Sequence, residues 1–150
     1  MRKDHRTPTV RRRGVTAVEV TLVMIPFMTL IVGTFEYCRY MMIRNLAENA
    51  CREGARFAVV HTYDKTTNDV RSIVSERMGG LDRNIEGITT SISKVNLATG
   101  ASLGDWTDAR FGEGIAVTIQ GNYRPITPNL LFMSTTIPIK CTSTMLSEAN

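Results

Sequence analysis

The sequence has few of the residues from which catalytic and metal centres are usually built. It contains two histidines and three cysteines among 150 residues, and the histidines, His5 and His61, stand far apart. It contains no Cys-x-x-Cys pair, His-Glu-x-x-His motif, phosphate-binding glycine loop or Gly-x-Ser-x-Gly elbow. These absences argue against the common metalloenzymes, nucleotide-binding enzymes and serine hydrolases. We therefore expect a protein that is not an enzyme, with no catalytic residue, metal site or cofactor.

The cysteines are also too few, and of the wrong number, for a disulfide framework. An odd number, Cys38, Cys51 and Cys141, excludes complete pairing within the chain. On one helix Cys38 and Cys51 would lie about 20 Å apart, which is too far for a disulfide. A disulfide between Cys51 and Cys141 is one alternative if the domain lies in an oxidising compartment. Small buried thiols are the simpler expectation for all three.

One segment is almost without charge. Residues 15–35 form an apolar run of 21 residues in which Glu19 is the single charged residue. As a helix this run is about 31 Å long, the thickness of a bilayer core. The alternative, a buried core helix, is less favourable because so small a remainder could hardly cover a helix that is apolar all round. We predict a transmembrane helix over residues 15–35.

Basic residues are concentrated before the apolar run. Residues 1–14 hold six basic residues and one acidic residue, a net charge of +5, whereas the remaining chain holds 12 basic and 13 acidic residues, a net charge of −1. This distribution indicates a membrane topology signal that includes Arg11, Arg12 and Arg13, and it argues against nucleic acid as a partner. It predicts a cytoplasmic N-terminus and a domain on the outer side of the membrane. The run is too long, and lacks the cleavage site, for an ordinary secretory signal.

The helix is expected to continue as an amphipathic extension over residues 36–61. Its apolar positions recur every three or four residues, which is the period of one helix face. Several of these positions carry small side chains, which allow another backbone to approach closely: Ala47, Ala50, Cys51, Gly54 and Ala58. The stripe fits packing against the protein's own sheet and packing against neighbouring subunits equally well.

Residues 62–150 are predicted to form a small α+β head. A second, short helix is expected after a cap at Thr67 or Asn68, and it should end at Gly79 and Gly80. The pattern then changes to alternation with a period of two, which is typical of strands.

About three antiparallel strands follow from this alternation, at residues 88–97, 114–123 and 135–146. Pro138 predicts that the last of them is an edge strand or is broken, because proline cannot donate to a ladder. The fold class is therefore α+β, with a long N-terminal helix whose second half completes the core of the head.

Glu19 lies five residues after Gly14, near the start of the apolar run. One interpretation is that its carboxylate reaches back to the lipid headgroups, since an acidic residue near the end of a span costs less than the about 2.5–3.5 kcal/mol of a central one. The other interpretation is functional. If the chain is cut after Gly14, Val15 carries a new ammonium group, and Glu19 of a neighbouring subunit can neutralise it where either charge alone would be costly.

Three segments together carry a family resemblance: Gly14-x-x-Ala17-Val18-Glu19-Val20, residues 33–39, and residues 49–59 with Arg-Glu-Gly-Ala-Arg. They resemble TadE-like proteins, the minor pilins or pseudopilins of the tight-adherence (Flp/Tad) pilus and secretion machinery. The resemblance covers residues 11–60 closely. It implies a bacterial inner-membrane protein with a periplasmic head, cleavage after Gly14 by a prepilin peptidase, and work with other pilus subunits and the assembly platform.

The resemblance is to a minor pilin and not to the major one. Val20 stands where the major Flp pilins have an aromatic residue, and those pilins have little chain beyond the helix. The competing hypothesis is an uncleaved, signal-anchored binding module that recognises a surface or a partner through its sheet. The two hypotheses differ in the fate of residues 1–14, which only the first removes.

Overall fold

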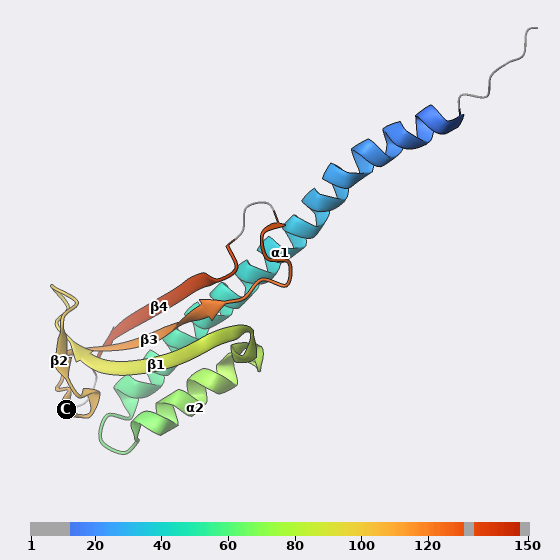
Figure 1. The fold of residues 1–150 in the computed structure, drawn as a ribbon. Coiled ribbons are helices and arrows are strands. Elements are labelled where there is room, and N and C mark those ends of the chain that lie inside the picture. The colour runs from blue at the N-terminus through green and yellow to red at the C-terminus, as the bar shows by residue number, and fades with distance from the viewer. Residues whose placement is uncertain (1–12, 131–133, 148–150) are drawn as a thin grey trace, which may run out of the picture.

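The computed structural model describes residues 13–130 and 134–147, with the side chains of the first helix given from Ala17 onward. It confirms the α+β class, with a long helix, a short helix and an antiparallel sheet (Figure 1). The elements in chain order are α1 (Arg13–Val60), α2 (Thr67–Arg77), η1 (Leu81–Asn84), β1 (Ile85–Val95), β2 (Ser102–Gly104), η2 (Trp106–Asp108), β3 (Gly114–Tyr123) and β4 (Ile137–Leu146).

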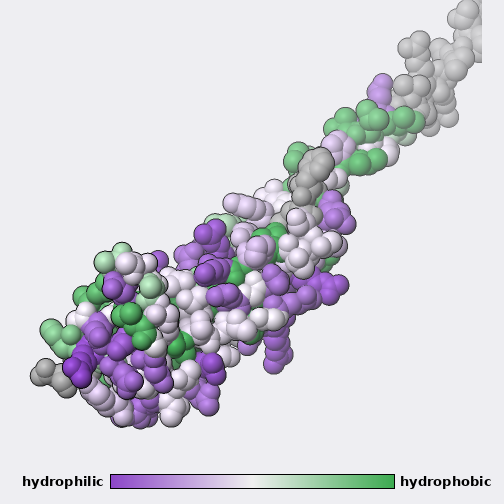
Figure 2. All heavy atoms as spheres, turned by 60° about the vertical axis from the view of Figure 1, so that its left-hand side comes forward, coloured by the Kyte–Doolittle hydropathy of each residue, from purple (hydrophilic) through white to green (hydrophobic). Residues whose placement is uncertain are grey.

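Helix α1 has two halves with different surroundings. Its 48 residues correspond to about 72 Å, and Pro26 does not interrupt it. The N-terminal half projects from the head, and hydrophobic residues cover it (Figures 1 and 2). In its most apolar stretch of 18 residues, no residue is buried against the rest of the protein. By length and composition the helix is able to cross a membrane. The C-terminal half lies against the sheet.

The sheet has four antiparallel strands in the order β2-β1-β3-β4. The predicted strand at 114–123 is confirmed as β3, and β4 is an edge strand with Pro138 opposite Asn122. The prediction of about three strands missed β2, whose three residues are too short for a periodic signal. Strand β1 begins earlier than expected, at Ile85, because the ladder continues past an irregularity at Gly87, whose φ is +63°.

The N-cap of helix α2 lies one residue before the first of the two predicted caps. Thr66 is the N-cap, and the carboxylate of Asp69 accepts hydrogen bonds from its backbone N–H at 2.8 Å and its hydroxyl at 2.9 Å. The acid three residues after a threonine was the overlooked signal. The end is as predicted, since Gly79 and Gly80 follow the helix with positive φ angles of 59° and 80°.

The small-residue stripe of α1 lies inside the head. Its four non-glycine members are at most 1% exposed, and Gly54 is buried too. A Cβ atom built on Gly54 would stand 2.6 Å from Val74 Cγ2 of α2 and 3.5 Å from Val117 Cγ1 of β3. Of the two interpretations of the stripe, the structure therefore shows packing within the chain, where α2 and the sheet approach α1 closely.

All three cysteines are free thiols in this structure. Cys38 is exposed, whereas Cys51 and Cys141 are buried between α1 and the edge strand. The Cys51 thiol donates to the Cys141 carbonyl at 3.3 Å. Burial raises the pKa of Cys51 to about 11, which keeps its thiol protonated and unreactive at neutral pH.

Candidate functional site: the apolar helix and its junction with the head

The predicted processing motif lies at the very start of α1. Arg11 and Arg12 are outside the described residues, and α1 begins at Arg13. Gly14 and Val15 therefore belong to the backbone of its first turn, although their side chains are not among those described. The predicted scissile bond thus stands at the N-terminal end of the helix, before its exposed apolar half.

Glu19 is an isolated carboxylate on this apolar half. It is exposed, and so are its neighbours Val18 and Val20, at 67% and 54%. It lies about 7.5 Å along the helix axis from Gly14. Among the described residues it has no hydrogen-bond or ion-pair partner. Any partner in a lipid environment would have to come from outside the described part of this chain.

A second carboxylate, Glu36, is buried where α1 meets the head. Only 5% of Glu36 is exposed, although it follows directly on the predicted membrane segment. Its Oε1 accepts a hydrogen bond from the Tyr123 hydroxyl at 2.5 Å and one from the Ile126 backbone N–H at 3.2 Å. Within the described residues no basic group lies within 4 Å of this carboxylate. Hydrogen bonds, and not an ion pair, therefore compensate its burial.

Arg39 is next to this carboxylate, one helical turn further along α1. Its Nη2 donates to Asn84 Oδ1 at 2.7 Å, and its guanidinium lies 5.8 Å from the centre of the Tyr123 ring. Arg39 Nη1 is buried without a hydrogen-bond partner among the described residues. Tyr40 also packs against Tyr123, with 5.6 Å between the centres of the two rings.

Together these contacts form a helix–head junction, which we define as Glu36, Arg39, Asn84, Tyr123 and Ile126. It joins α1 to the end of η1 and to the end of β3, over sequence separations of 45 to 90 residues. A charged, buried hydrogen-bond acceptor is costly to leave unpaired, so the contacts hold the head in one orientation on the helix. The junction therefore connects the head to α1 directly beside the apolar half of the helix.

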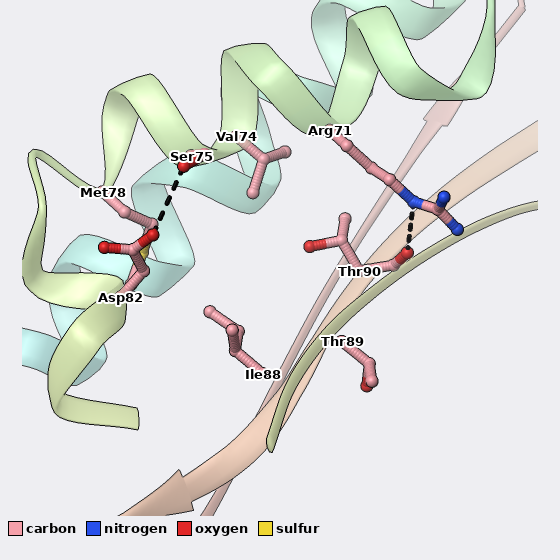
Figure 3. A pocket seen from close by; sticks show the side chains of 8 residues that line it. All are labelled: Arg71, Val74, Ser75, Met78, Asp82, Ile88, Thr89 and Thr90. Atoms are coloured by element: carbon pink, nitrogen blue, oxygen red, sulfur yellow. Dashed lines mark hydrogen bonds between the residues drawn. The ribbon is translucent and has the colours of Figure 1, made fainter. Parts of the chain in front are cut away.

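The head also contains a hollow of about 370 Å³ between α2 and β1 (Figure 3). Apolar side chains of Val74, Met78 and Ile88 contribute to its lining, and two of its polar side chains donate hydrogen bonds to other residues of the lining. Arg71 donates to the Thr90 carbonyl at 3.2 Å, and Ser75 donates to Asp82 at 3.3 Å. Among the described residues no group of three or more histidine, cysteine or acidic side chains is placed to hold a metal ion. The hollow offers no convergent set of reactive groups, so the junction and the apolar helix remain the candidate site.

The segment that matches a known protein family lies in this same helix, α1. Residues 14–56 match the family model of TadE-like proteins. The resemblance predicted from the sequence is thereby confirmed over this segment, which contains Gly14, Glu19 and two junction residues, Glu36 and Arg39. The match associates the chain with the tight-adherence (Tad) pilus system. No curated protein and no solved structure matches the chain.

The junction was missed by the sequence-based prediction, although two of its five residues lie in the TadE-like segment. Glu36 was assigned only to a charged stretch of helix after the membrane segment. A single acid directly after a long apolar run is not a usable signal of burial, because hydrated charges are common at that position. Its buried partner, Tyr123, is 87 residues away in the sequence, and no local pattern connects the two.

Replacing Tyr123 by phenylalanine tests the helix–head junction. The variant removes one of the two donors to a buried carboxylate, so the free energy of unfolding should fall by about 1–3 kcal/mol. Denaturation of the full chain in detergent micelles, followed by the fluorescence of the buried Trp106, measures this change. The matched control is Tyr37→Phe on the exposed side of α1, where 58% of the residue is accessible. Equal stability of both variants would contradict the role of the junction.

The same variant gives a pH dependence with a defined sign. Burial, with the hydrogen bond to Glu36, raises the pKa of Tyr123 from its usual value near 10 to about 12. The folded state therefore favours the neutral phenol of Tyr123. The stabilisation that the neutral phenol gives is fully present below pH 10 and is lost as the pH rises from about 10 to about 12. The stability difference between wild type and Tyr123→Phe should narrow over that interval.

Proposed function

We propose that this protein is a membrane-anchored minor pilin, or pseudopilin, that acts in assembly of the tight-adherence pilus or in the associated secretion. One observation carries the proposal. The TadE-like segment presents an exposed apolar helix whose isolated carboxylate, Glu19, lies five residues after Gly14. A carboxylate is unfavourable in lipid without a partner, so this position calls for one that arrives during assembly.

Cleavage after Gly14 would create that partner. The new ammonium group of Val15 stands close to the membrane surface, and Glu19 of a neighbouring subunit neutralises it when the apolar helices pack together. In this scheme the prepilin peptidase removes residues 1–14. The partners are then the inner membrane, other pilus subunits and the assembly platform, and the protein acts as a structural subunit and not as an enzyme.

The proposed orientation follows from charge. The basic residues before the apolar helix, including Arg11, Arg12 and Arg13, hold the N-terminus in the cytoplasm and direct the head to the periplasm. The helix–head junction then lies on the periplasmic side, directly outside the membrane, where it orients the head relative to its anchor.

Mass spectrometry of the mature N-terminus in the native host tests the processing step. The wild-type protein should begin at Val15, and Gly14→Val should retain the leader because a branched side chain replaces hydrogen at the scissile bond. Ala17→Val, three residues further along the same helix, is the matched control and should be cleaved normally. An intact leader on the wild-type protein would overturn the proposal and favour the uncleaved binding module.

A further inference from the structure

The described first part of the connection from β3 to β4, residues 124–130, lies further along α1 toward its apolar half than the helices and strands of the head (Figure 1). It leaves β3 at Tyr123, and its course is fixed at once by the hydrogen bond from the Ile126 N–H to Glu36. Glu36 is the first residue after the predicted membrane segment. The connection is thereby held at the level where α1 leaves the membrane.

If residues 15–35 span the membrane, Ile126 stands at the level of the headgroup layer. Glu36 follows Phe35 by about 1.5 Å along the helix axis, whereas the polar layer on each side of a bilayer is about 5–7 Å thick. The nitrogen of Ile126 is 3.2 Å from the Glu36 carboxylate. Tyr37 is exposed one residue further on, and tyrosine is enriched at this depth in membrane proteins.

Residues 124–130 expose one large apolar side chain, that of Ile126. It is 68% exposed, although Pro125 before it is buried. Residues 124–130 contain no acidic side chain, and the guanidinium of Arg124 pairs with the Glu86 carboxylate at 3.1 Å. An exposed branched apolar side chain beside the end of an apolar helix suits contact with the lipid headgroups and the outer acyl chains.

From these observations we infer that residues 124–130 of the β3–β4 connection dock on the membrane surface, with Ile126 inserted at the headgroup level beside α1. The inference rests on the proposed function, because it requires α1 to be inserted in a membrane. The head would then have two attachments to the bilayer, the helix and this connection, and the junction at Glu36 would join them. This fixes the tilt of the head as well as its distance from the membrane.

A depth measurement on the full chain tests the inference. Ile126→Cys is labelled with an environment-sensitive fluorophore after Cys38→Ser removes the exposed native thiol, and the protein is reconstituted in phosphatidylethanolamine–phosphatidylglycerol vesicles. Cys51 and Cys141 are buried, at 1% and 5% exposed, and escape labelling. Leu103→Cys in β2 is the matched control, because it is also an exposed apolar residue, at 54%, but lies at the other end of the sheet.

The expected result is a blue-shifted emission at position 126 and quenching by spin-labelled lipids at least about twofold stronger than at position 103. Native Cys38, labelled alone, gives the reference depth for the helix exit. If the protein floats with the vesicles but the fluorophores at both positions emit as they do in water, the inference about Ile126 is overturned, while the membrane anchor of the proposed function is supported. If the protein does not float with vesicles, the membrane anchor of the proposed function fails, and the inference fails with it.

Discussion

Replacing Glu19 by glutamine is expected to leave the leader cleaved but to reduce incorporation into the pilus at least about tenfold. Glutamine keeps the size and helix propensity of glutamate and removes only the charge, so the ammonium group of Val15 would remain unpaired in the apolar interior of the assembly. Glu19 has no partner among the described residues of its own chain, so folding of the head should not change.

The measurement compares the amount of subunit in sheared pili with the amount in the membrane fraction. Glu76→Gln is the matched control, because Glu76 is exposed on α2 and the same charge is removed far from the apolar helix. Normal incorporation of Glu19→Gln at normal membrane levels would exclude the ion pair. That result would favour the other interpretation, in which the Glu19 carboxylate reaches back to the lipid headgroups.

Replacing Gly54 by valine is expected to lower the free energy of unfolding by about 1–3 kcal/mol. The new Cβ atom would stand 2.6 Å from Val74 Cγ2, and Val74 is itself only 2% exposed. The gain in helix propensity over glycine offsets less than about 1 kcal/mol of this cost. To relieve this steric clash, α2 has to move away from α1, which also loosens the packing of the sheet at Val117.

Denaturant unfolding of the full chain measures this effect. Asn49→Val is the matched control, because Asn49 is exposed on the same helix and has a helix propensity close to that of valine. The control should change stability by no more than about 0.5 kcal/mol. Stability of the Gly54 variant equal to that of the control would mean that α1 and α2 do not pack as closely as described.

Much of the fold could be predicted from local pattern. The continuous helix follows from a long stretch in which Pro26 is the single proline, and strand β3 follows from strict alternation. Pro138 correctly indicated an edge strand, because its missing N–H excludes it from the interior of a ladder. The three-residue strand β2 and the start of β1 could not be predicted, since a short strand and an irregular ladder depend on pairing with distant residues.

Some features of the candidate site could likewise be predicted from local sequence, whereas others depend on contacts between distant segments. The sequence by itself determined the apolar helix, the basic leader and the spacing of Gly14 and Glu19, because composition and spacing along one chain segment are sufficient for all three. Only the tertiary structure decided that Glu36 is buried, that the small-residue stripe packs inside the head, and that Ile126 lies beside Glu36. These features arise from contacts between segments as far apart as 90 residues, which become neighbours only when the head folds onto the helix.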